Sequence, residues 1–146
     1  MGDAITSFTS FLREVEGRVF SWRRPMEHLQ KRILVVDDDQ GILDSFEALL
    51  GDRYDLIKAE NGYEALRILK DDPPQLMFLD IKMPGINGID ILKRLQEEKK
   101  AVDVVIITAS SQESIEEEAK SFGIIDYLKK PLDIFEVDRI ASQVLA

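Results

Sequence analysis

The sequence contains no cysteine and a single histidine, His28, among its 146 residues. Without cysteine the chain can form neither disulfide bonds nor thiolate metal sites, and one histidine without partners makes no metal centre. No apolar run approaches the roughly 20 residues that cross a membrane, and the N-terminus lacks the apolar core of a signal peptide. The length and the 45% hydrophobic content suit one globular domain, for which we expect a cytoplasmic location.

Positive charge is also scarce over most of the chain. Residues 1–32 carry six basic and four acidic side chains, whereas residues 33–146 carry 13 basic and 24 acidic ones. An acidic domain repels phosphate groups, so we expect no direct binding of nucleic acid. Clustered carboxylates do suit Mg²⁺, which prefers hard oxygen ligands.

Residues 1–31 differ in pattern from the rest of the chain. Apolar side chains recur there at alternating steps of three and four, which predicts an amphipathic helical extension. Pro25 should end or kink this helix near Arg24, and Gly17 weakens it. The pattern is compatible with a dimerising coiled coil, with docking on the chain's own domain and with capture of another protein. The apolar stripe consists of Ile5, Phe8, Leu12, Val15, Val19, Trp22, Met26 and Leu29.

Residues 32–146 alternate between short apolar runs and segments with helical spacing. This alternation predicts an α/β domain, in which right-handed crossovers build a doubly wound parallel sheet with helices on both faces. The five expected strands are residues 33–36, 54–59, 75–80, 102–108 and 124–128. Helices are expected after each strand, and the last one is expected over residues 132–145.

Polar side chains stand where four of these strands end. Asp37 and Asp38 follow the first strand, Asp80 ends the third, Thr108 ends the fourth and Lys130 follows the fifth. The carboxyl ends of parallel strands share one edge of a sheet, so these groups should meet. Three carboxylates so close need a balancing cation, and Mg²⁺ fits them. A carboxylate beside Mg²⁺ can attack phosphorus, so the pattern indicates phosphoryl transfer onto or from an aspartate.

Each residue taken singly also has an ordinary structural explanation. Asp38 or Asp39 would serve as a helix cap, and Asp80 could bond only its own loop. Thr108 would be a common β-branched strand residue, and Lys130 a surface lysine. It is the coincidence of all these residues at the ends of strands that favours a site.

These motifs together resemble the receiver domain of two-component response regulators. The resemblance rests on Asp37-Asp38, on residues 80–88, on Thr108-Ala109 and on Lys130-Pro131, and it covers the chain from about Ile33 to Ala146. It implies a five-stranded sheet of order 2-1-3-4-5. The corresponding domain division is an extension over residues 1–31 followed by a receiver domain over residues 32–146.

The resemblance also implies roles for individual residues. Asp80 would accept a phosphoryl group from a sensor histidine kinase or a histidine phosphotransfer protein. Mg²⁺ would be held by Asp37, Asp38, Asp80 and the backbone carbonyl of Lys82. Thr108 and Lys130 would contact the phosphoryl group.

Tyr127 would turn inward as Thr108 moves, which would switch the face formed by the fourth helix, fifth strand and fifth helix for partner binding or self-association. Such a domain assists its own phosphorylation and dephosphorylation without being an enzyme in the usual sense. Lys82 and Ser110 occupy positions that tune the lifetime of the phosphoryl group, and the long Lys82 side chain predicts a fairly long lifetime.

Two other functions compete with this interpretation. One is a receiver-fold interaction module that is never phosphorylated, although this chain keeps every acidic and lysine position of the motif. The other is a phosphatase of the haloacid dehalogenase type, in which Asp37 instead of Asp80 would be the nucleophile. That function requires a further acidic pair on a late strand, which this sequence does not supply. The resemblance does not distinguish a receiver that stands alone from one followed by an output domain.

Overall fold

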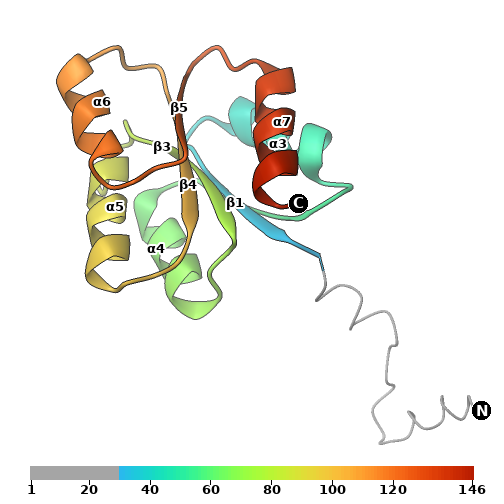
Figure 1. Cartoon of the computed structure of the whole chain (residues 1–146), viewed down its shortest axis with the longest axis horizontal. Helices are drawn as coiled ribbons and strands as arrows, with labels where there is room; N and C mark the ends of the chain where they lie inside the picture. The colour runs from blue at the N-terminus through green and yellow to red at the C-terminus, as the bar shows by residue number, and fades with distance from the viewer. Residues whose placement is uncertain (1–29) are drawn as a thin grey trace, which may run out of the picture. The chain divides into compact units, whose positions relative to one another are not determined.

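The computed structural model describes residues 30–146, and these form a five-stranded parallel sheet with helices packed on both faces (Figure 1). The sheet order is β2-β1-β3-β4-β5, as the sequence predicted. The strands are β1 Arg32–Val36, β2 Asp55–Ala59, β3 Leu76–Asp80, β4 Asp103–Thr108 and β5 Asp126–Lys129. The amphipathic helix expected over residues 1–31 lies almost wholly outside the described residues.

The helices divide between the two faces of the sheet. Helices α3 and α7 cover one face, and α4, α5 and α6 cover the other (Figure 1). Each face buries its own hydrophobic cluster, and Phe46 of α3 packs on Phe78 of β3 with ring centroids 4.9 Å apart. Central strands buried on both sides explain why the sequence shows continuous apolar runs there. The helices are α3 Gln40–Leu50, α4 Gly62–Asp71, α5 Gly88–Glu97, α6 Glu113–Lys120 and α7 Ile134–Val144.

Polar side chains fix where four of the helices start. Asp39 caps α3 by accepting from the Gly41 N–H, so the third aspartate of the run is the cap. Asn61 and Asn87 cap α4 and α5, and Asp133 caps α7. An N-cap satisfies backbone donors that have no partner inside the helix, and it sets the point where the chain leaves the loop. The loops at the carboxyl edge therefore have defined ends.

Two predicted starts differ from the structure by two residues, and the other predicted strand ends differ by at most one. The fifth strand starts at Asp126 instead of residue 124, because its register with β4 begins at the pair Val105 and Asp126. Ile125 precedes this register and is 47% exposed, so it contributes to the apolar run without lying in the strand. The last helix starts at Ile134 instead of residue 132, because Asp133 caps it.

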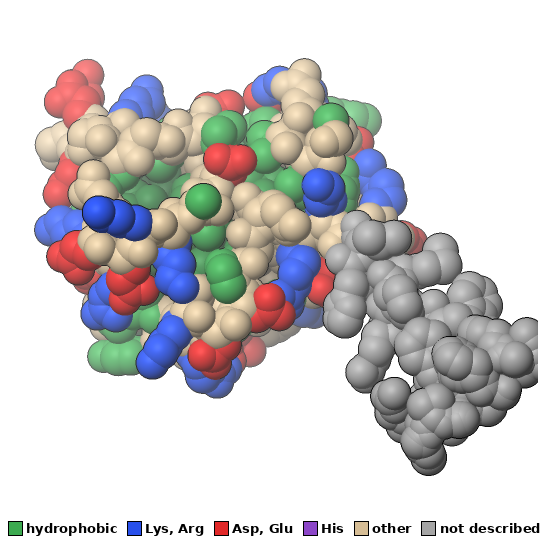
Figure 2. All heavy atoms as spheres, turned by 60° about the horizontal axis from the view of Figure 1, so that its bottom comes forward, with side chains coloured by type: hydrophobic (Ala, Val, Ile, Leu, Met, Phe, Trp, Pro, Cys, Tyr) green, Lys and Arg blue, Asp and Glu red, His purple; other side chains and the backbone are tan. Residues whose placement is uncertain are grey.

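The surface of the described residues carries charges of both signs. On the face shown in Figure 2, acidic and basic side chains are interspersed, and hydrophobic side chains lie between them. Within residues 30–146, no helix is long and apolar enough to cross a membrane.

Candidate functional site

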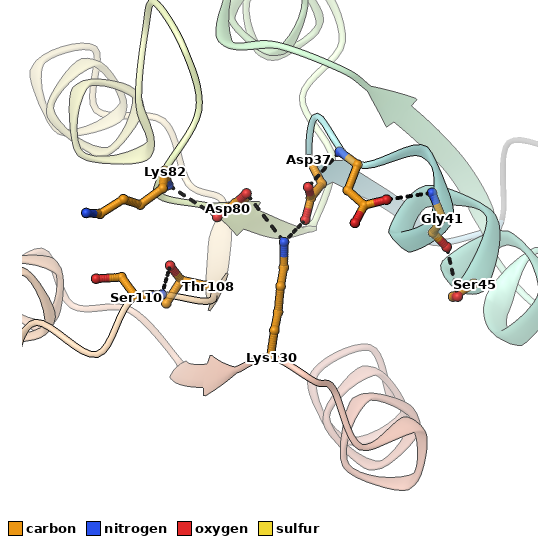
Figure 3. Close-up of polar contacts among 9 residues, drawn as sticks. Asp37, Gly41, Ser45, Asp80, Lys82, Thr108, Ser110 and Lys130 are labelled. Atoms are coloured by element: carbon orange, nitrogen blue, oxygen red, sulfur yellow. Dashed lines mark hydrogen bonds and ion pairs between the residues drawn. The ribbon is translucent and has the colours of Figure 1, made fainter.

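The candidate site lies at the carboxyl edge of the sheet, where the strand order reverses. β1 sits between β2 and β3, so the chain leaves β1 and β3 toward opposite faces of the sheet, the position at which such sheets commonly bind ligands. The ends of β1, β3, β4 and β5 bring the predicted polar residues to this edge (Figure 3).

Asp37 is the most enclosed carboxylate of the site, with no exposed surface. Its N–H donates to Ala59 O at 3.1 Å, which ties the end of β1 to β2. Its Oδ1 accepts from the Asp39 N–H at 2.9 Å. Its Oδ2 lies 2.6 Å from Lys130 Nζ. The ammonium of Lys130 is therefore the cation that this fully buried carboxylate contacts within residues 30–146.

Asp80 is 4% exposed and ends the central strand β3. Its Oδ1 accepts from the Lys82 N–H at 3.2 Å, and its Oδ2 lies 3.5 Å from Lys130 Nζ. Burial and then the charge of Asp37 raise the pKa of Asp80 to about 6, and Lys130 opposes this shift. The positive charge of Lys130 therefore does not offset the burial of Asp80 and the negative charge of Asp37.

Lys130 connects the two carboxylates. Its backbone N–H donates to Thr108 O at 2.8 Å, so the end of β4 places it. Its ammonium reaches Asp37 at 2.6 Å and Asp80 at 3.5 Å (Figure 3). Burial disfavours the charged form, but the contact with Asp37 and the charge of Asp80 outweigh it, so the pKa of Lys130 is raised. Lys130 therefore stays protonated at neutral pH.

The carboxylates form a cluster that suits a divalent cation. Asp37, Asp38 and Asp80 each offer an oxygen, and these oxygens lie within 4.8 Å of one another. Asp38 is exposed, so the cluster opens to solvent on its side. Among residues 30–146, Lys130 is the one ammonium in contact with this cluster of three carboxylates, and it reaches Asp37 and Asp80. An all-oxygen donor set with an open side fits Mg²⁺, which retains water ligands.

Thr108, Ser110 and Lys82 lie on the Asp80 side of this cluster (Figure 3). Thr108 is fully buried, and its Oγ1 accepts from the Ser110 N–H at 3.1 Å. The Lys82 side chain is exposed and extends away from the Asp80 carboxylate (Figure 3). The backbone of residue 82, rather than its ammonium, is therefore the part that contacts Asp80.

Tyr127 lies on the same sheet face as Thr108. It pairs with Ile106 in the register of β4 and β5, two residues before Thr108, and side chains two apart on a strand share a face. Its ring packs on the cluster beneath α4, α5 and α6, and its hydroxyl is buried without a hydrogen-bond partner in the described part of the chain. Burial raises the pKa of this hydroxyl.

Comparison with known proteins decides the family. A family model described as the response regulator receiver domain matches residues 33–141. The chain belongs to this family. Receiver domains are the signalling domains of two-component systems, and the resemblance noted in the sequence is thereby confirmed.

The relatives include two proteins of similar length and a larger regulator. Sporulation initiation phosphotransferase F of Bacillus subtilis is 36% identical over 110 residues, covering 75% of this chain and 89% of the relative. Protein PilH of Pseudomonas aeruginosa is 34% identical and covers 79% and 98%. The DNA-binding transcriptional regulator NtrC of Escherichia coli is 35% identical over 78% of this chain but only 24% of its own length.

Solved structures share the fold of the receiver domain. A response regulator receiver domain protein of Methanospirillum hungatei has a TM-score of 0.73 and 26% identity, covering 79% of this chain and 94% of that chain. The signal receiver domain of an HD domain-containing protein of Pseudomonas fluorescens has a TM-score of 0.74 and 26% identity, covering 80% and 94%.

The structure thus brings together Asp37, Asp38, Asp80 and Lys130, as expected from their positions at strand ends. The sequence indicated helix starts at Gly62 and Gly88, and Gly88 ends the motif over residues 80–88. It did not predict that both glycines pack against the loop after Asp80.

Proposed function

We propose that Asp80 accepts a phosphoryl group from a phosphohistidine of a sensor histidine kinase or a histidine phosphotransfer protein, with Mg²⁺ bound. The observation that carries the proposal is the charge deficit around Asp80: a buried carboxylate with a raised pKa shares one ammonium, that of Lys130, with a second buried carboxylate, Asp37. Family membership supports the same conclusion.

The transfer step needs a carboxylate, a leaving group and neutralising charge. An oxygen of ionised Asp80 forms a bond to phosphorus while the phosphorus–nitrogen bond of the donor histidine breaks, and its electron pair stays on the imidazole. Since the pKa of Asp80 is about 6, the nucleophile is ionised at neutral pH. Lys130, between Asp80 and Asp37, then pairs with the new phosphoryl oxygens.

Asp37, Asp38, Asp80 and the Lys82 backbone carbonyl are the residues that we propose hold Mg²⁺. When bound, the ion neutralises charge on the transferring group. Asp37 and Asp38 place the ion, and Lys130 remains free to move from Asp37 toward the phosphoryl group. In this proposal the carboxylates would hold the ion, and Lys130 would pair with the phosphoryl group.

Phosphorylation would act on the rest of the domain through Thr108. A new charged group beside Thr108 Oγ1 competes for the hydrogen bond that Ser110 N now donates to it. Tyr127 shares the sheet face with Thr108, so movement of one frees space for the other. We propose that this switches the face formed by α6, β5 and α7 for partner binding or self-association, and that Lys82 and Ser110 set a fairly long phosphoryl lifetime.

A shallow apolar cavity beside the site offers a contact for the donor protein. Its volume is about 200 Å³, and it lies between α3 and α7. Pro131, which follows Lys130 directly, lines it together with Ile42, Phe46 and Ile134. A donor whose histidine reaches Asp80 would cover this cavity, so we propose it as part of the docking surface.

The remaining parts of the proposal concern the whole chain. We propose that the chain divides into an extension over residues 1–31 and a receiver over 32–146. We also propose that it forms a homodimer, either through the extension or through the α6–β5–α7 face. Its location would be cytoplasmic, and it would not bind nucleic acid directly. The unphosphorylated interaction module and the haloacid dehalogenase-type phosphatase remain the competing functions.

Intact-mass spectrometry after incubation with acetyl phosphate and Mg²⁺ tests the acceptor. We expect one phosphate adduct on the wild type, none with a chelator and none on Asp80→Asn. An adduct that persists in Asp80→Asn but disappears in Asp37→Asn would favour the phosphatase. A folded wild type that takes up no phosphate would favour the interaction module.

A further inference from the structure

The loop between β3 and α5, residues 81–87, is contacted by the first residues of two helices. α4 and α5 both begin with a glycine after an asparagine cap: Gly62 after Asn61 and Gly88 after Asn87. Both glycines are buried, and neither has a positive φ. A left-handed backbone therefore does not explain glycine at these positions, but lack of space does.

Gly88 lies directly against the backbone of the phosphoacceptor. A Cβ at this position would lie 2.7 Å from Ile81 Cα and 2.8 Å from the Asp80 carbonyl oxygen. The Gly88 N–H also donates to Ile81 O at 2.9 Å. Because the neighbours are backbone atoms, no side-chain rotation can relieve the overlap. The first turn of α5 thus rests on the peptide that carries Asp80.

Gly62 holds the other end of the same loop. A Cβ there would lie 2.6 Å from both the Cβ and the carbonyl oxygen of Ile86. The next residue, Tyr63, reaches over the loop, with its Cε2 3.4 Å from the place of a Cβ on Gly85. The loop is therefore clamped between the start of α4 and the start of α5.

We propose that Gly62 and Gly88 are positioning residues of the cation site, because they hold the β3–α5 loop where Asp80 and the backbone of Lys82 can share an ion with Asp37. This inference rests on the proposed function, which assigns the ion to these residues. Asp80 Oδ1 accepts from the Lys82 N–H at 3.2 Å, so a shift of the peptide after Asp80 moves the carboxylate too. Second-sphere contacts that orient ligands commonly change metal affinity by about 10- to 100-fold.

Mn²⁺ binding to the full-length chain, followed by electron paramagnetic resonance of the free ion, tests the proposal. The variants are Gly88→Ala and Gly62→Ala. Gly51→Ala is the matched control, since a Cβ there would lie 2.6 Å from Glu47 O after the end of α3, just before β2. Circular dichroism gives the thermal midpoint of each variant, so that loss of stability and loss of affinity are measured separately.

We expect Gly88→Ala to raise the Mn²⁺ dissociation constant by about tenfold or more, and Gly62→Ala to raise it by a smaller factor. Gly51→Ala should lower the thermal midpoint but leave the dissociation constant within about twofold. If Gly88→Ala does not fold, Gly62→Ala decides, because its overlap is with Ile86 and not with the backbone of Asp80 and Ile81.

Unchanged Mn²⁺ affinity in the folded glycine variants would overturn the inference, as would an equal loss of affinity in Gly51→Ala. A wild type that binds Mn²⁺ and takes up phosphate while the glycine variants keep its affinity contradicts this inference alone. A wild type that binds no Mn²⁺ contradicts both the inference and the proposed function.

Discussion

The two edges of the sheet balance charge in opposite ways. At the amino edge, Arg32 pairs with Asp55 at 3.0 Å and with Asp72, and its N–H donates to Gln75 Oε1 at 2.8 Å. At the carboxyl edge, Asp37 and Asp80 share a single ammonium. In the first arrangement one side chain from each strand end is paired with opposite charge, whereas in the second two buried carboxylates share one positive charge.

This contrast indicates what each edge is for. Opposite charges that neutralise each other hold strand β1 and the segment before β3 together and need no ligand. Like charges buried together oppose folding unless something else balances them. The carboxyl edge therefore gives up some stability of the metal-free protein in return for affinity toward a cation and a phosphoryl group.

The largest expected effect concerns Lys130. Lys130→Met removes the only ammonium in contact with Asp37 and Asp80 among residues 30–146. We expect the initial rate of phosphate uptake from acetyl phosphate to fall by about 100-fold, the usual cost of losing one charge-stabilising donor. Lys129→Met is the matched control, since Lys129 is exposed and has no carboxylate within 4.0 Å in the described range. Equal rates in both variants would contradict the account.

The second-largest expected effect is a pH dependence of the unfolding free energy that arises at the carboxyl edge and not at the amino edge. Because the folded pKa of Asp80 is raised to about 6, the folded protein keeps a proton that the unfolded chain has released, so metal-free stability falls as pH rises through that window. Asp80→Asn removes this loss. We expect its advantage in unfolding free energy over the wild type to grow by about 2 kcal/mol between pH 4.5 and 7.5.

Urea unfolding in the presence of a chelator measures this difference. Arg32→Ala serves as the comparison, since its difference from the wild type should change little over the same pH range. An advantage of Asp80→Asn that stays constant with pH would show that Asp80 ionises normally.

A smaller effect is expected at the amino edge. Arg32→Ala should lower the unfolding free energy by about 1 kcal/mol, because the side chain is only 23% exposed and contacts two carboxylates. Arg94→Ala breaks an exposed pair with Glu98 at 3.8 Å and should cost less. Phosphate uptake should be unchanged in both. A large loss of uptake in Arg32→Ala would remove the distinction between the edges.

The smallest expected effect concerns the cavity between α3 and α7. Ile134→Gln should slow phosphoryl transfer from a protein donor by a few-fold and leave uptake from acetyl phosphate unchanged. Phe135→Gln is the control, because Phe135 is 78% exposed but does not line the cavity. Paired rates with a phosphorylated phosphotransfer protein and with acetyl phosphate check this. Equal slowing by both variants would argue against the cavity as the docking site.

Much of the site could be predicted from the sequence because it depends on chain order. Apolar runs that end in Asp37 and Asp80 predict strands, and parallel strands place their ends at one edge. The 2.6 Å contact of Lys130 with Asp37 could not be predicted, because it depends on the register of β5 and on side-chain orientation.

The start of β5 and the packing of Gly62 and Gly88 against the loop after Asp80 could not be predicted, for related reasons. Ile124 and Ile125 extend an apolar run that the strand does not use, since pairing with β4 decides where β5 begins. The contacts of Gly62 and Gly88 depend on how closely α4 and α5 approach the loop after Asp80, and this distance is a property of packing.

Calorimetric titration of Mg²⁺ into the wild type, Asp37→Asn and Arg32→Ala tests most directly whether the carboxyl edge is built for a cation. We expect saturable binding to the wild type, the same dissociation constant in Arg32→Ala, and a dissociation constant at least about tenfold higher in Asp37→Asn. Absence of binding in the wild type, or an unchanged constant in Asp37→Asn, would contradict the account.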